Sequence, residues 1–548
     1  MQMRLSRLTA LLGAVGLAAC GDPLSVTNNN VVDVTAAQQT AQGIEQIIGK
    51  SFQAMFVGQY NNGDNVWMQS INMAHESSSS LGNFAMGLRN GVPRVAIDNS
   101  RANSAAAGTN ADFSVLTRLA RQNVNALRSQ DKLPPGTSAT SGRARAFGYF
   151  AIGYAMGHLA AIYDSAAILT PSRTPEDTLF AADVVNVQAL AMLDSAIATV
   201  RGAGGQGVNF PIPGDYMTGS SIDTTQFIRI VRSYKAKFRA AIARNPTERA
   251  AVDWEAVRAD AAAGITANIN VALDPSLGWS MNNTLVQLNL FLGWHQTPYF
   301  ILGMADTTGA YSTYLSQPII GSPARNGASF LVRTPDKRFP SGDTRAAQQA
   351  FQGATIPAAG VYFRNRPSGE DTGNNADPWS NSQYDNFRFR PIRDNVGVGT
   401  WTLFPVTEIR MLQAEALMRL GRTAEAIPLI NVTRTANNLP ALAVTLASTD
   451  PVPGGTGCVP KVPQPGVFTS AVCGSVFEAM KWEKRMETQL TGYCQWYLDS
   501  RGWGDLPLGT SVSWPVPYQE LDSRSRPLYN STVLSGASTY GLGRGAGF

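Results

Sequence analysis

The stretch EIRMLQAEALMRLGRTAEAIPLINVTRTANNLPAL, residues 408–442, predicts two short helices that pack against each other. In its first half, apolar residues recur at the spacing of one helix face. They are Ile409, Leu412, Ala416 and Leu420. Gly421 follows them, and a glycine ends a helix easily because it adopts the left-handed backbone at no steric cost. We therefore expect a first helix over about 406–420.

The second half of this stretch predicts a partner helix over about 423–437. Thr423 is placed to cap its first turn. Ala424, Ile427 and Ile430 supply a second apolar stripe, and Pro428 removes one backbone hydrogen bond, so we expect a small bend. Two helices joined by so few residues lie antiparallel. That unit is typical of helical repeats such as the tetratricopeptide repeat, which usually hold partners.

The same periodicity predicts further helices on the N-terminal and C-terminal sides of this pair. All the expected helices lie at about 36–57, 111–129, 139–164, 181–201, 223–243, 253–268, 406–420, 423–437 and 474–500. Between about 270 and 400 the periodicity fades, and Gly, Pro, Asn and aromatic residues dominate. The predicted fold is mainly α: a tetratricopeptide-like scaffold of helical pairs at about 36–270 and 400–505, carrying a long irregular, loop-rich middle region at about 270–400. We expect residues 36–548 to form one domain.

Composition describes a folded protein with no special affinity for nucleic acid. Hydrophobic residues make up 44% of the 548 residues and charged residues only 15%, which excludes a disordered chain. The formal net charge is +5, and no run of Lys and Arg occurs. A charge this small on a large surface gives no reason to expect a nucleic-acid partner.

The N-terminus, MQMRLSRLTALLGAVGLAAC, resembles a bacterial lipoprotein signal. Arg4 and Arg7 precede an apolar run of about ten residues, which is shorter than the roughly 20 needed to span a bilayer. Small residues then lead to Cys20, as in the lipobox. We expect a signal peptide over 1–19, lipidation of the Cys20 thiol and an extended tether over 20–35. The alternative is an ordinary signal peptide with a chance cysteine. Because we identify no other apolar run of spanning length, we expect a lipid-anchored chain.

Three further cysteines remain after Cys20. Cys458 and Cys473 bracket a loop of Pro, Gly and Val, and an oxidising compartment would permit a disulfide between them. Cys494 lies among aromatic residues and is interpreted as a buried free thiol. Because no CxxC spacing occurs, we predict no zinc site.

A search for catalytic motifs finds none that stands out. His75-Glu76 begins like a zinc-protease motif, but position 79 is Ser, so the second histidine ligand is missing. The run 202–207 matches G-x-G-x-x-G but follows a predicted helix instead of a strand, so we interpret it as a linker. No G-x-S-x-G elbow is present. His158 is interpreted as a core residue. We predict no enzyme activity, no cofactor and no metal.

Aromatic residues of the middle region are the best candidates for ligand contact, because flat rings stack on sugars or peptide side chains. Trp294 and Tyr299 rank first, since rings and hydrogen-bonding groups alternate in GWHQTPY, residues 293–299. Trp67 and Tyr311 rank next. The alternative, which we consider correct for most of these rings, is that they anchor loops on the scaffold.

Five stretches of the chain resemble the SusD/RagB family of outer-membrane nutrient-binding lipoproteins. They are Cys20–Leu24, Ala144–Phe150, Lys337–Phe339 with Asp343–Arg345, Glu408–Pro440, and Glu483–Glu487 with Gly492, Trp496, Asp499, Arg501 and Trp503. The match is strongest over 400–505 and weakest over 270–400. It departs from the family pattern at Thr491, where Glu is usual, and near Cys494, where Arg is usual.

The resemblance implies a lipid-anchored protein of the outer membrane, exposed at the cell surface. In this family the helical scaffold docks on a TonB-dependent outer-membrane transporter of the SusC type. The lipoprotein captures oligosaccharides or peptides and delivers them to that transporter. Two alternatives stay open: an envelope scaffold without a small ligand, and an enzyme that processes glycans or peptides.

Overall fold

The structure is a computed structural model, and it describes most of the chain. The described residues are 37–61, 65–79, 85–91, 94–134, 141–173, 178–202, 210–281, 295–317, 331–353, 357–367, 382–536 and 538–542. The predicted signal peptide 1–19, the tether 20–35 with Cys20, and Trp294 lie outside these residues.

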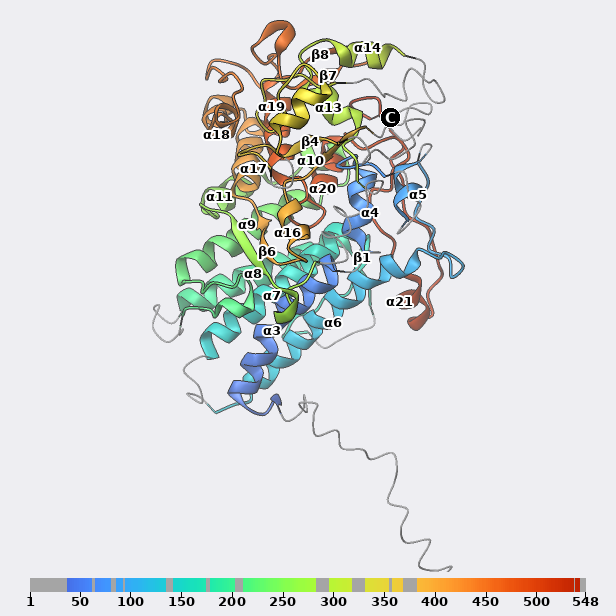
Figure 1. Ribbon diagram of the computed structural model, residues 1–548. Helices are drawn as coiled ribbons and strands as arrows, with labels where there is room; N and C mark the ends of the chain where they lie inside the picture. Colours follow the sequence, from blue (N-terminus) through green and yellow to red (C-terminus); the bar gives the residue numbers. More distant parts are fainter. Residues whose placement is uncertain are drawn as a thin grey trace, which may run out of the picture.

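Long helices form an array in which each helix packs on the next along the chain. They are α3 (Ala41–Tyr60), α6 (Ala106–Gln130), α7 (Ser141–Ile162), α8 (Ala182–Gly202), α9 (Thr224–Ala241), α11 (Trp254–Ala262), α17 (Val406–Arg419) and α18 (Thr423–Ala436). The helices from α3 to α9 fill the lower half of Figure 1, and α17 and α18 lie above them. The prediction of a mainly helical, tetratricopeptide-like scaffold is confirmed.

The helical pair of α17 and α18 forms largely as the sequence predicts. Gly421 follows α17 with a φ of +75°, the left-handed conformation that ends the helix. Ile409, Leu412 and Ala416 are buried, whereas Leu420 at the end of the stripe is exposed.

The predicted capping of the second helix is wrong. The cap position is Arg422, which makes no side-chain capping bond. Its guanidinium instead binds the Glu425 carboxylate within the first turn, with an Nε–Oε1 distance of 2.7 Å. Ala424 is exposed, and Ala426 takes its place on the buried face.

The described part of the region from 270 to 400 contains short elements. Its helices are α13 (Tyr299–Ala305), α14 (Ala310–Ser316), α15 (Arg345–Phe351) and α16 (Arg390–Asp394). Strand β4 (Phe363–Asn365) pairs antiparallel with β5 (Tyr384–Asn386), and β3 (Ile269–Leu273) pairs antiparallel with β6 (Gly399–Phe404). The β3–β6 pair lies where the middle region meets the helical array.

The remaining elements are short and complete the periphery. They are α4 (Val66–Met73), α5 (Met86–Asn90), α10 (Pro246–Ala250), α21 (Tyr518–Ser523), η2 (Gly214–Tyr216), η3 (Pro275–Leu277), η5 (Gly455–Gly457), β1 (Ser165–Ala166), β2 (Phe180–Ala181), β7 (Lys461–Pro463) and β8 (Ala471–Cys473). Strands β1 and β2 form one antiparallel pair, and β7 and β8 another.

The helix predicted over 474–500 is two helices, α19 (Val476–Thr488) and α20 (Gln495–Trp503). Between them, Leu490, Gly492 and Cys494 have positive φ angles, which a helix excludes. Glu76 fixes this break from a distant part of the chain. Its carboxylate accepts a hydrogen bond from the Leu490 backbone N–H at 2.7 Å, and its backbone oxygen accepts one from the Gln489 side chain at 2.7 Å.

One continuous cluster of buried residues extends from Ile44 to Leu542, and a second, smaller cluster lies between α17, α18 and α19. His158 belongs to the first cluster, where it packs on Tyr154, Phe238 and Tyr493. Burial, followed by the charge of Lys237, lowers the pKa of His158 to about 3, so its ring is neutral. The interpretation of His158 as a core residue is confirmed.

The cysteines beyond residue 20 follow the expected arrangement. Cys458 and Cys473 form a disulfide, and Cys494 is a buried free thiol. Among the described residues, α8 has the length and apolar composition of a membrane-spanning helix, although the sequence analysis identified no such run. One helix of this kind is weak evidence for a span, because core helices have the same composition.

Candidate functional site

Three of the predicted ligand-contact rings lie in the core. Tyr299 and Tyr311 both pack on Tyr314, with ring centroids 4.9 Å and 6.5 Å apart, and each is at most 2% exposed. Trp67 is fully buried against Tyr60, in a different part of the core. This packing agrees with the alternative interpretation, in which the rings anchor loops on the scaffold. Ligand contact by these rings stays a prediction and would require them to become exposed.

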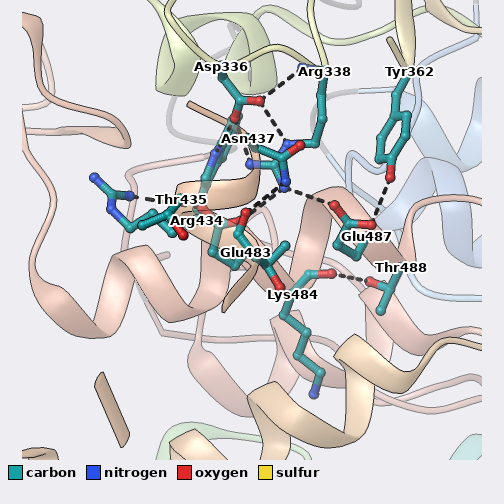
Figure 2. Close-up of polar contacts among 12 residues, drawn as sticks. Asp336, Arg338, Tyr362, Arg434, Thr435, Asn437, Glu483, Lys484, Glu487 and Thr488 are labelled. Carbon is teal, nitrogen blue, oxygen red and sulfur yellow. Dashed lines mark hydrogen bonds and ion pairs between the residues drawn. The ribbon is translucent and has the colours of Figure 1, made fainter. Parts of the chain in front are cut away.

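A buried ion network joins the middle region to the scaffold (Figure 2). The Arg338 guanidinium binds the Asp336 carboxylate at 2.6 Å, the Glu483 carboxylate at 3.0 Å and the Glu487 carboxylate at 3.2 Å. Tyr362, also from the middle region, donates its hydroxyl to Glu487 at 2.9 Å. Because Glu483 and Glu487 lie one turn apart on α19, a single arginine holds both.

Helix α19 carries two further buried ion networks on its other faces. Lys484 binds Asp499 of α20 at 2.8 Å. Lys481 and Arg485 both bind Asp505, at 2.9 Å and 2.5 Å. We call α19 and its three networks the α19 junction. Since a buried charge that loses its partner costs several kcal/mol, this junction fixes the middle region and the C-terminal segment rigidly on the helices.

An accessible hollow lies on the solvent side of the β3–β6 pair, next to α9. We call it the α9 cavity, and its volume is about 360 Å³. It is lined by Thr218, Ser220, Ser221, Ile222, Gln226, Ile230, Asn268, Ile269, Asn270, Ala272 and Thr400. Strand β3 builds its wall by alternation, since Asn270 and Ala272 are exposed while Val271 and Leu273 are buried.

A second hollow, the η3 cavity, adjoins the first and has a volume of about 550 Å³. Ala272 and Thr400, which face each other in the β3–β6 register, line both cavities. The loop from η2 passes over this point: the Thr218 carbonyl accepts a hydrogen bond from the Ala272 N–H at 3.4 Å. Gly219 has a φ of +82°, and a Cβ there would lie 2.9 Å from that of Ala272. We call the two cavities together the sheet groove.

The chemistry of the sheet groove suits binding more than catalysis. None of the residues lining the α9 cavity is ionisable. In the η3 cavity, Lys50 and Asp215 form an exposed ion pair at 2.8 Å. A hydrogen bond from the Ser276 hydroxyl lowers the pKa of Asp274, so this carboxylate is not tuned as a proton donor. Among the described residues, no group of His, Cys, Asp and Glu is arranged to hold a metal ion.

A larger cavity of about 750 Å³ lies between α8, α9 and α10, and two of its charged groups, Arg244 and Glu248, make hydrogen bonds within the protein. Arg244 donates to the carbonyl oxygens of Ala160 and Tyr163, and Glu248 accepts from Arg244 N–H and Asn245. The sheet groove is therefore the better candidate for a ligand.

The sequence analysis did not identify the sheet groove, because it looked for aromatic rings and catalytic motifs. A usable signal was present. Asn268 and Asn270 alternate with apolar residues ahead of a buried strand, which is the pattern of a strand with one polar, exposed face.

Comparison with known proteins finds similarity in structure only. No protein-family model and no curated protein matches the sequence. A SusD superfamily protein from Bacteroides thetaiotaomicron aligns with a TM-score of 0.52 at 9% identity, over 91% of this chain and 100% of that one. A SusD homolog from Parabacteroides distasonis aligns with a TM-score of 0.51 at 13% identity, over 86% of both chains.

A SusD-like protein from Bacteroides fragilis gives the same TM-score of 0.51, at 13% identity, over 86% of this chain and 88% of that one. These alignments extend over 86–91% of this chain, so they match more than a helical repeat alone. The chain has the fold of the SusD superfamily.

Proposed function

We propose that this chain is a surface lipoprotein that captures oligosaccharides or peptides and delivers them to a partner TonB-dependent outer-membrane transporter. The observation that carries the proposal is the extent of the structural match. It spans 86–91% of this chain and 86–100% of three solved SusD-type chains. A scaffold that needed only helical repeats would not require the irregular half of this architecture.

The sheet groove supports a binding role. It is open to solvent, its polar lining is ready for hydrogen bonding, and its α9 cavity contains no ionisable group that could act as a general acid or base. A capture protein must also release its ligand, so we expect affinities in the micromolar to millimolar range, or roughly −4 to −8 kcal/mol.

Calorimetry on the mature chain tests ligand capture. Soluble protein beginning at Gly21 is titrated with neutral oligosaccharides, acidic oligosaccharides and short peptides. Saturable binding of any of these classes without turnover supports the proposal. Binding of none of them contradicts ligand capture and favours an envelope scaffold, and release of cleaved products favours an enzyme.

A second experiment tests delivery and anchoring. Native protein is purified in detergent together with the TonB-dependent transporter encoded nearest to it, and a stable complex is expected. Cys20→Ala should prevent lipid addition and release the protein from membranes after a salt wash. A variant that stays membrane-bound would contradict the lipid anchor.

A further inference from the structure

Three carboxamide side chains line the α9 cavity, and each uses only its oxygen within the protein. Gln226 Oε1 accepts a hydrogen bond from the Asp223 backbone N–H at 3.2 Å. Asn268 Oδ1 accepts one from the Val406 backbone N–H at 2.9 Å. A backbone N–H can only donate, so in both side chains the atom facing it must be the oxygen.

The third carboxamide is held by a neighbouring strand. Asn270 on β3 accepts a hydrogen bond at Oδ1 from the Thr402 hydroxyl on β6, at 3.0 Å. The NH2 groups of Gln226, Asn268 and Asn270 have no protein partner within the described part of the chain. Because each oxygen is fixed on the protein side, each NH2 group is left on the cavity side.

The rest of the lining defines what those NH2 groups can recognise. The hydroxyl groups of Ser221 and Thr400 add further hydrogen-bonding positions, whereas Ile222 and Ile230 are at most 4% exposed and add little apolar surface. None of the lining residues that the structure describes carries a charge. An anionic or cationic ligand would therefore lose its hydration in this cavity without gaining an ion pair, whereas an uncharged ligand rich in acceptor oxygens would not.

We infer that the α9 cavity is a subsite for a neutral saccharide, whose hydroxyl, ring or acetamido oxygens accept hydrogen bonds from the three fixed NH2 groups. This inference rests on the proposed capture function and assigns it a place and a ligand class. The volume of about 360 Å³ lies near the lower end of small-ligand sites, about 300–1,000 Å³, which suits one or two sugar rings.

The test uses substitutions that replace only the free donors. Gln226→Glu, Asn268→Asp and Asn270→Asp each keep the oxygen that binds the protein and replace NH2 by a second oxygen. Asn530→Asp is the matched control, because Asn530 is exposed and its Oδ1 also accepts a backbone hydrogen bond, from Asn99, but it lies outside the cavity. Mature chains are titrated with neutral di- and trisaccharides of glucose, galactose, mannose, xylose and N-acetylglucosamine.

We expect a neutral saccharide to bind the wild type. Each cavity variant should raise the Kd for that saccharide by about tenfold, because one or two hydrogen bonds are lost. The control should stay within about twofold. Thermal melts within about 2 °C of the wild type would establish that the variants are folded.

Two outcomes would overturn the inference while leaving the capture function intact. The first is a neutral saccharide whose Kd is unchanged in all three variants. The second is binding of galacturonate oligomers or tri-alanine when no neutral saccharide binds. If neither saccharides nor peptides bind, the inference and the capture function both fail.

Discussion

The α19 junction and the sheet groove are both polar, but they use their polar groups in opposite ways. At the junction, Arg338 is fully buried and divides its donors among three carboxylates. In the groove, Gln226 and Asn268 use one atom inside the protein and leave the other to solvent. A polar group that is completed inside the fold stabilises it, whereas a fixed but incomplete group is available to a ligand.

The largest expected effect is at the junction. Arg338→Met removes the cation and leaves Asp336 and Glu483 buried without their partner, which should lower the free energy of unfolding by about 3–5 kcal/mol. Urea denaturation measures it. Arg101→Met is the control, since the Arg101–Asp522 pair is exposed and should contribute little to stability. Equal losses would mean that the junction is no more important than a surface ion pair.

A second effect concerns pH and Glu76, the buried carboxyl that fixes the break between α19 and α20. Burial raises the pKa of Glu76 to about 8, so between about pH 4.5 and 8 the folded state holds a proton that the unfolded state has lost. The contribution of Glu76 to stability is therefore full below pH 4.5 and is lost as the pH rises through 8. Glu76→Gln cannot ionise and keeps an oxygen for the Leu490 N–H.

Between pH 5 and 8, wild type should lose about 2–4 kcal/mol of stability that Glu76→Gln retains. Thermal melts at several pH values compare the two proteins. The control is Glu425→Gln: Glu425 is exposed and its hydrogen bond to Arg422 lowers its pKa, so this side chain titrates below the window. Parallel pH profiles for wild type and Glu76→Gln would contradict the buried, protonated state of Glu76.

A smaller loss of stability is expected for substitutions at Gly219, where the loop after η2 crosses the sheet groove. Gly219→Val introduces both a left-handed backbone strain and a contact with Ala272, and should cost about 2–3 kcal/mol. Gly309→Val carries the same strain, with a φ of +86°, but no atom lies near its added Cβ. It should cost about 1–2 kcal/mol. If the two losses are equal by urea denaturation, the loop is not packed on β3.

The smallest effect should be in the groove itself. Asn268→Asp keeps its hydrogen bond from Val406, so its unfolding free energy should change by less than about 0.5 kcal/mol. Differential scanning calorimetry measures this change. A loss of several kcal/mol would place Asn268 with the structural polar groups of the junction and remove the contrast between the two regions.

Local signals predicted the helical array well. The pair over 406–437 follows from a stripe of period 3.6 and from Gly421, both of which act within a few residues. The break after Thr488 could not be predicted in this way, because it depends on Glu76, more than 400 positions away in the chain. Thr423 is not the cap because it is the first residue of α18, so the cap position falls on Arg422.

The candidate site was less predictable than the fold, for a related reason. Rings such as Tyr299 and Tyr311 suit both a ligand face and a core, and the sequence around them does not say whether another segment covers them. The groove needs residues from α9, β3, β6 and the η2 loop to come together. Only the alternation around Asn270 was visible locally.

The composition of α19 has a consequence for the chain before it folds. The segment VFEAMKWEKRMET carries Glu478, Lys481, Glu483, Lys484, Arg485 and Glu487, yet it lies at the centre of the finished molecule. An apolar helix in the same place would make a newly made, unfolded chain prone to aggregation, because exposed hydrophobic segments drive aggregation. Here a segment that ends up largely buried is hydrophilic while unfolded, and becomes compatible with the interior only when Arg338, Asp499 and Asp505 arrive to neutralise it.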